Sequence, residues 1–191
     1  MERHNKVTVN KSENNWNNLY VLNTLDWSKI YINPFRSTID TKLRAFQYKF
    51  LKQILPTNDF LHKCKIVQSS LCDLCNMHNE TIIHLFWECP VSQAFWSNFS
   101  RFLEENNIVV HVDYLTIALG VFSNDRKSIV TNFLILIAKY LLYKCKLNKT
   151  EPNISMFKSE LKQREQIERL IAISKNKIEV HNLKWNSINI I

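Results

Sequence analysis

Residues 70–90 read SLCDLCNMHNETIIHLFWECP, and the cysteines and histidine of this stretch decide how the chain folds. Cys72 and Cys75 are separated by two residues, His84 follows after eight more, and Cys89 after a further four. Three thiolates and one imidazole at this spacing can share a single tetrahedral ion, and such a donor set is typical of structural zinc sites. Because the protein would fill all four positions, no position is left for a substrate or an activated water. We therefore expect one Zn²⁺ that stabilises the fold and performs no chemistry.

Other donors in this region leave the ligand set open. Cys64 or His78 could take the place of His84 as the fourth ligand. The cysteines could also be buried thiols without a metal, since free cysteine is among the most buried residue types.

The second half of the motif raises a question of geometry. On an unbroken α-helix, His84 and Cys89 would point about 140° apart, because five steps of about 100° separate them. Pro90 disfavours helical backbone at Cys89. We therefore expect the chain to leave the helix at Cys89 and to bring the thiolate back toward the metal.

Glycine content limits the fold class. The chain has a single glycine in 191 residues. Nucleotide-binding loops and tight hairpins need glycine where φ is positive, so a Rossmann unit, a P-loop or a sandwich of short strands is excluded. We predict a mostly α fold, a small helical domain organised around a CCHC zinc knuckle and followed by a C-terminal helical hairpin. Its segments are an N-terminal docking segment (1–35), the zinc domain (36–105) and a helical tail (106–191).

Apolar periodicity predicts the individual helices. Asn33 and Pro34 close the N-terminal segment, because a residue before proline avoids helical backbone. Pro90 opens a helix after the cysteine motif, and further helices run from about 125 to 147 and from 153 to 176. The helix before the motif ends at Pro56, and its expected inward positions are Leu43, Phe46, Phe50, Leu51, Ile54 and Leu55. In the helix from 153 to 176 the expected inward positions are Phe157, Leu161, Leu170 and Ile171.

Positive charge is unevenly distributed. The net charge is +8. Residues 36–65 hold seven Lys or Arg against two Asp, and residues 126–149 hold six against no acidic residue. Two basic blocks favour a polyanionic partner, most simply nucleic acid. The first fifteen residues lack the apolar core of a signal peptide, and the longest apolar run is too short for a membrane span, so we expect an intracellular protein without a membrane partner.

The motif and its flanks closely resemble the reverse-transcriptase zinc-binding domain of non-LTR retrotransposon polyproteins. The resemblance rests on residues 70–90, the following Phe95-Trp96, and the preceding stretches 43–49 and 55–58. It implies Cys72, Cys75, His84 and Cys89 as metal ligands and a role in binding the RNA of the element. The parent polyprotein would be an RNA-directed DNA polymerase, and the chain would reside in a cytoplasmic or nuclear ribonucleoprotein.

No catalytic function is expected of this chain itself, since its aspartates are scattered singly and offer no adjacent pair for two Mg²⁺ ions. We predict a nucleic-acid-binding module, with RNA the expected partner and no small-molecule substrate. Basic residues on phosphates and an aromatic ring on bases would make the contacts. The candidates are Arg44, Lys49, Lys63, Lys65, Trp87 and Arg101. The alternative is a protein-interaction module that docks on the polymerase part of the parent, with zinc purely structural.

Overall fold

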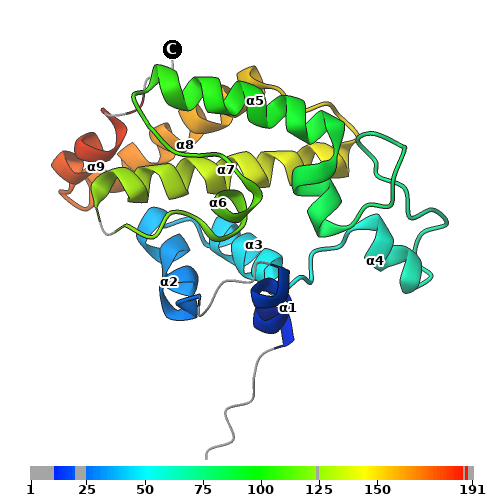
Figure 1. The fold of residues 1–191 in the computed structure, drawn as a ribbon. Coiled ribbons are helices and arrows are strands. Elements are labelled where there is room, and N and C mark those ends of the chain that lie inside the picture. The colour runs from blue at the N-terminus through cyan, green and yellow to red at the C-terminus, as the bar shows by residue number, and fades with distance from the viewer. Residues whose placement is uncertain (1–10, 20–24, 124, 187, 189–191) are drawn as a thin grey trace, which may run out of the picture.

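The computed structural model describes residues 11–19, 25–123, 125–186 and 188 (Figure 1). These residues are mostly helical, and their one β interaction is an isolated antiparallel bridge between Leu71 and Asn79. The prediction of a mostly α fold is confirmed. The helices are α1 Lys11–Leu19, α2 Trp27–Ser37, α3 Thr41–Leu51, α4 Asn58–Lys63, the π-helical turn η1 His84–Glu88, α5 Pro90–Glu105, α6 Tyr114–Leu119, α7 Arg126–Asn148, α8 Ile154–Ser174 and α9 Ile178–Trp185.

Helix α7 is the centre of the fold. It crosses the middle of the molecule in Figure 1 and packs against α2, α3, α6 and α8. Its 23 residues span about 35 Å and are apolar around most of the circumference, which is the pattern of a buried helix. By length and composition alone it would also suit a membrane span, but most of its side chains are buried among the other helices.

Short polar side chains start several of the helices. The Asp40 carboxylate accepts the backbone N–H of Lys42 at 2.7 Å and begins α3. Asp125 and Asn153 cap α7 and α8 in the same way. Gly120 ends α6 with φ +86°, a backbone conformation that only glycine adopts readily.

Two helix ends differ from the prediction. Pro34 lies inside α2 and does not close the segment, because the helix is held by Ile30 and Pro34, which are both buried. Helix α3 ends at Leu51 because Gln53 takes a left-handed conformation with φ 56°. The chain then turns outward, so Ile54 is 51% exposed and the prediction that it points inward is wrong.

The C-terminal part forms the expected hairpin of α7 and α8, followed by α9, which the sequence analysis did not predict. Phe157 and Leu161 are fully buried, as predicted, where α8 packs between α5 and α7. Leu170 is 69% exposed, so its predicted inward position is wrong. The distal half of α8 has α9 on one side and presents its other side to solvent.

One hydrophobic core joins the three segments predicted from the sequence. It contains Trp16 and Ile30 of the first segment, Phe50 and Phe86 of the second, and Phe133, Phe157 and Trp185 of the third. The ring of Phe86 in η1 stacks edge-on against Phe50 of α3 with centroids 5.0 Å apart. Folding of the zinc-binding region is therefore coupled to packing of the C-terminal helices.

Candidate metal centre

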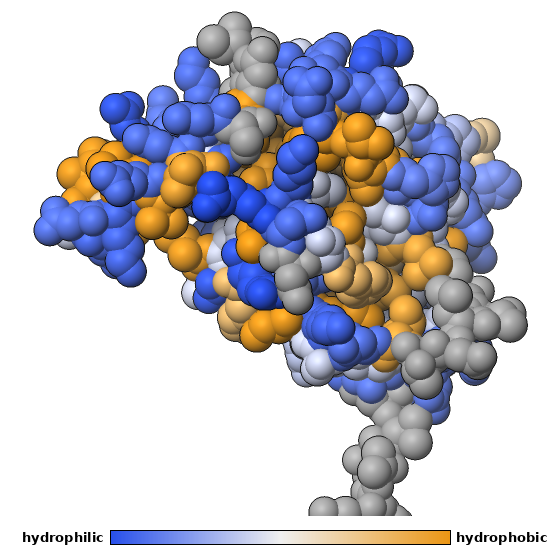
Figure 2. All heavy atoms as spheres, turned by 60° about the vertical axis from the view of Figure 1, so that its left-hand side comes forward, coloured by the Kyte–Doolittle hydropathy of each residue, from blue (hydrophilic) through white to orange (hydrophobic). Residues whose placement is uncertain are grey.

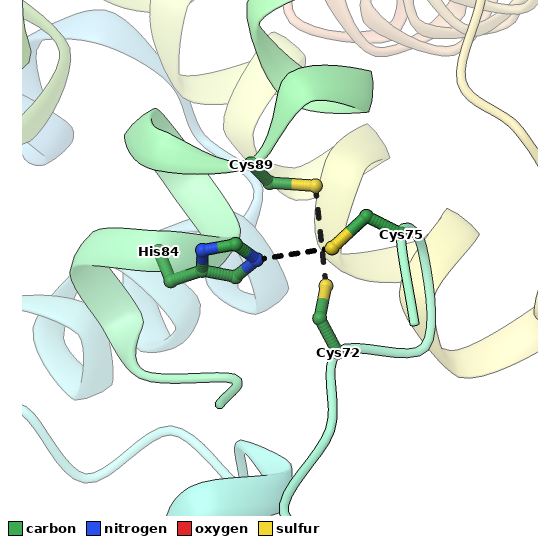
Figure 3. A group of neighbouring side chains, drawn as sticks. All are labelled: Cys72, Cys75, His84 and Cys89. Atoms are coloured by element: carbon green, nitrogen blue, oxygen red, sulfur yellow. Dashed lines mark hydrogen bonds between the residues drawn. The ribbon is translucent and has the colours of Figure 1, made fainter. Parts of the chain in front are cut away.

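Cys72, Cys75, His84 and Cys89 converge on one point (Figure 3). Their donor atoms all lie within 4.8 Å of one another. Cys72 Sγ is 4.0 Å from Cys89 Sγ, and Cys75 Sγ is 3.3 Å from His84 Nε2. Tetrahedral zinc, with metal–sulfur bonds of about 2.3 Å and metal–nitrogen bonds of about 2.0 Å, places its donors about 3.5–3.8 Å apart. The donor set and its spacing therefore fit a zinc ion.

A tight turn presents the first two thiols. Leu71 pairs with Asn79 across the turn, and the backbone N–H of Cys72 donates to His78 O at 2.8 Å. Asn76, in the left-handed conformation with φ 56°, reverses the chain directly after Cys75. Both sulfurs consequently face the same side of the turn.

A π-helical turn brings His84 and Cys89 together. The N–H of Cys89 donates to His84 O at 2.8 Å, an i→i+5 bond that closes one wide turn. Cys89 itself is extended, with φ −63° and ψ 127°, and Pro90 begins α5. The chain thus leaves the helix at Cys89 as predicted, but the wide turn preceding it, which the sequence analysis did not foresee, also places residue 89 back over residue 84.

The alternative ligands lie outside this cluster. Cys64 is exposed and is not part of the donor group. The ring of His78 is exposed and meets the ring of His84 edge-on with centroids 5.5 Å apart. Among the described residues, His84 is thus the imidazole that completes the set.

The two buried thiols opposite each other have pKa values shifted in opposite directions. The hydrogen bond with Cys89 raises the pKa of Cys72, and burial raises it further. The same hydrogen bond, helped by the backbone N–H groups of Ser92 and Val91 at the start of α5, lowers the pKa of Cys89 to about 5. A divalent cation binds the sulfurs of Cys72 and Cys89 as thiolates. Because the folded chain brings these two sulfurs together, zinc binding and folding are coupled here.

The centre leaves no coordination position open. Three thiolates and one imidazole supply the four ligands that zinc takes in structural sites, whereas catalytic zinc keeps one position for water or substrate. The arrangement stabilises a fold and offers no reacting group.

A buried carboxylate connects the metal centre to α7. Glu80 is fully buried, and its carboxylate accepts the N–H groups of Asn58 and Asp73, both at 2.9 Å. Lys146 of α7, 4% exposed, lies 3.3 Å from Glu80 Oε1 and 3.7 Å from Asp73 Oδ2. Because Asp73 lies between the first two ligands, this network fixes the thiol turn against the central helix. Glu80 lies within the stretch 70–90 that carries the zinc ligands, but nothing in the sequence signals that Lys146, so distant along the chain, is its partner.

The comparison with protein families agrees with this geometry. Residues 5–96 match the family described as zinc-binding in reverse transcriptase. The chain carries a reverse-transcriptase zinc-binding domain. The match begins within the segment that the sequence analysis set apart as residues 1–35 and ends at Trp96, whose indole N–H donates to Phe86 O in η1 at 2.7 Å. No solved structure matches the chain.

The six nucleic-acid contacts predicted from the sequence do not form one cluster. Arg44 and Lys49 lie on α3, Lys63 and Lys65 lie at the end of α4, and Arg101 lies exposed on α5. Their involvement in binding stays a prediction.

Several of these side chains already have partners. The Arg44 guanidinium donates to Thr38 O at 2.8 Å and stacks over the ring of Phe35. Lys63 pairs with Asp59 at 2.6 Å. Trp87 is half-buried, with its ring tilted against Tyr114.

The second basic block is less available than its charge count indicates. Lys146 is bound to Glu80, and Lys139 is 2% exposed, with its ammonium 2.5 Å from Gln47 Oε1. Burial holds the pKa of Lys139 well below its usual value. These two lysines of the block are therefore not available to contact a polyanion, and the prediction of a polyanionic partner rests on the other basic residues.

Proposed function

We propose that this chain is a non-catalytic, zinc-stabilised module that binds single-stranded nucleic acid, with RNA as the expected ligand. In this proposal it is the C-terminal part of a non-LTR retrotransposon polyprotein and acts beside the polymerase that copies RNA into DNA. The family match and the filled donor set support the zinc-stabilised, non-catalytic part of the proposal.

The observation that carries nucleic-acid binding is a hollow of about 570 Å³ between α2 and α3. Three aromatic rings line it: Tyr31, Phe35 and Tyr48, of which Phe35 is 58% and Tyr48 53% exposed. Exposed rings are platforms on which bases stack, and stacking is worth about 1–3 kcal/mol per base without regard to sequence. We call this site the α2–α3 hollow.

Cations are interleaved with these rings. Arg44 lies 4.8 Å from the centroid of Phe35, and Lys52 lies 4.9 Å from that of Tyr31. Lys49, an exposed neighbour of Tyr48, completes the basic lining. Alternation of rings and cations suits a strand whose bases stack while its phosphates follow the charges. Two of the predicted contact residues, Arg44 and Lys49, belong to this lining.

The zinc centre supports the hollow from behind. Phe86 in η1 lies between the two zinc ligands of that turn and packs against Phe46 and Phe50 on the inner side of α3. Tyr48 and Lys49 lie on the outer side of the same helix. A structural metal that fixes η1 therefore also fixes the position of α3, which lines the hollow. The metal itself does not contact the nucleic acid.

Binding of a fluorescent 12-nucleotide oligouridine to the zinc-loaded chain tests the proposal. Affinity is measured at several salt concentrations for the wild-type chain and for Tyr48→Ala, Lys49→Glu and the control Lys162→Glu, an exposed lysine of α8 that does not line the hollow. Circular dichroism and zinc content verify that each variant is folded.

We expect Tyr48→Ala to weaken binding about five- to 150-fold, as loss of one stacked base predicts. Lys49→Glu reduces the slope of log affinity against log salt by about one unit, while Lys162→Glu leaves affinity within twofold. Flat, weak binding that neither variant changes would overturn the proposal and favour the protein-docking alternative.

A further inference from the structure

A second hollow lies at the C-terminal end of α2, where α2, α8 and α9 meet the start of α7. Its volume is about 450 Å³. It continues into a neighbouring hollow of about 230 Å³ along α8, and the two share Ile39, Glu168 and Ile171. Together they form an elongated channel, which we call the α8–α9 groove. Figure 2 brings this side of the molecule forward and shows apolar side chains bordered by hydrophilic ones.

The floor of the groove is apolar and open to solvent. Ile39 is 52% exposed, Ile167 58%, Val180 65% and Leu183 52%. Clusters of large exposed apolar side chains with a polar rim are typical of surfaces that bind a partner. The apolar residues of the groove are Phe35, Ile39, Ile129, Val130, Ile167, Ile171, Ala172, Val180 and Leu183.

The groove is formed in advance of binding. Helix α9, which makes one wall, is anchored by Trp185, which is buried and donates from Nε1 to Glu168 Oε2 at 2.9 Å. Lys184 pairs with the same carboxylate at 2.8 Å, and its ammonium lies over the ring of Phe133 in α7. A partner therefore meets a rigid wall and has no rearrangement of α9 to drive.

The rim is mainly basic. Arg36, Arg126, Lys175 and Lys177 line the groove in addition to Lys184. Its two acidic lining residues, Glu168 and Asp40, are already paired with Lys184 and Arg164. From Ile167 to Lys175 the channel follows α8 for about 12 Å, which is about two helical turns. A floor of this length accepts apolar side chains at positions i, i+3 or i+4 and i+7 of a docked helix.

From these observations we infer that the α8–α9 groove docks an acidic amphipathic helix of a partner protein. The helix places its apolar side on Ile39, Ile171 and Val180 and its Asp or Glu side chains against the basic rim. This surface shares Phe35 with the α2–α3 hollow and no other lining residue, so the two sites border each other at that ring. The substitutions that test the groove therefore avoid Phe35.

A displayed library of helical peptides tests the inference on the zinc-loaded full chain. Each peptide carries leucines at i, i+3, i+4 and i+7, with Glu or Lys chosen at random at the flanking positions. We expect enrichment of peptides with Glu at most flanking positions. No enrichment, or enrichment of Lys-rich peptides, would overturn the inference.

Substitutions at exposed positions of the groove then locate the binding site. Val180→Ser with Leu183→Ser, and separately Lys175→Glu with Lys177→Glu, should each weaken the best enriched peptide at least tenfold. The controls Ile173→Ser and Lys162→Glu lie on α8 outside the groove and should stay within twofold. Equal binding by all four variants would place the peptide elsewhere and refute the assignment.

Two further measurements separate other occupants. If Lys175→Glu with Lys177→Glu abolishes oligouridine binding, the groove is a nucleic-acid surface and the inference fails. If sedimentation shows a dimer that Val180→Ser with Leu183→Ser dissociates, the occupant is a second copy of this chain and the inference also fails. Weaker oligouridine binding by Tyr48→Ala, with peptide binding intact, shows that the two proposals stand separately.

Discussion

Replacing Glu80 by Gln tests whether the buried ion pair with Lys146 holds the zinc-binding turn against α7. The carboxylate is fully buried and lies 3.3 Å from the ammonium. At an effective dielectric constant of about 20, two unit charges at that distance attract by about 5 kcal/mol. Gln retains the shape but loses the charge, so Lys146 keeps only Asp73 at 3.7 Å and Pro56 O at 3.3 Å. Breaking a buried pair in this way costs about 3–5 kcal/mol.

Lys146→Met removes the other partner and leaves a buried carboxylate that still accepts two backbone N–H bonds. We expect it to cost about 3 kcal/mol, and the double variant to cost less than the sum by about 2–3 kcal/mol, since neither charge is then uncompensated. Lys144→Met is the matched control. Its pair with Glu160 is partly exposed, at 41% for the lysine side chain, and should be worth less than about 1 kcal/mol.

The assay is urea unfolding at a fixed, buffered free zinc concentration, followed by circular dichroism and tryptophan fluorescence. Zinc affinity, measured by competition with a chromophoric chelator, should fall about 10- to 100-fold in Glu80→Gln, because the carboxylate fixes the Asp73 N–H between two ligands. A coupling energy below about 0.5 kcal/mol, or single variants as mild as Lys144→Met, would refute the reasoning.

Three other outcomes are expected. Metal analysis should find a single zinc ion per chain, and Cys75→Ala should lose it together with the fold of residues 70–100; a stable metal-free wild type would contradict this. Gly120→Ala should cost about 1–3 kcal/mol in urea unfolding, because φ is +86° and a Cβ would lie 2.6 Å from Asn132 Oδ1; an unchanged midpoint would argue against strain. Burial raises the pKa of Asp40, but hydrogen bonds from Arg164 and the first amides of α3 outweigh it and lower the pKa below 3.8. The difference in unfolding free energy between the wild-type chain and Asp40→Asn should therefore be largest above about pH 4 and disappear as the pH falls through the folded-state pKa of Asp40. Urea unfolding of both proteins at a series of pH values measures it. A difference that does not depend on pH would exclude the ion pair as its source.

The donors of the zinc centre could be predicted because thiol and imidazole spacing is a local property of the sequence. The path that unites them could not be predicted in full. The i→i+5 turn from His84 to Cys89 has no composition signal of its own, and helical periodicity assumes an α-helix. Packing of Phe86 against α3 accompanies the wider turn, and such long-range packing is not encoded in the motif.

The limits of charge counting are clearest on α7. Lys139 and Lys146 enter the sequence-level total as two solvated cations, yet one lies in the core beside Phe50 and the other neutralises Glu80. A lysine's neighbours along the helix do not reveal a distant carboxylate or amide. Similarly, the inward position of Phe157 followed from periodicity, whereas the exposure of Leu170 depends on where α8 passes beyond its partners.

The family signature stops at Trp96, but the cation that neutralises Glu80 is supplied fifty residues later by Lys146. Anyone who trims the chain to its recognisable motif would retain every zinc ligand and discard the counter-charge of the carboxylate beside them. The shortest piece that behaves like the whole must therefore extend through the central helix.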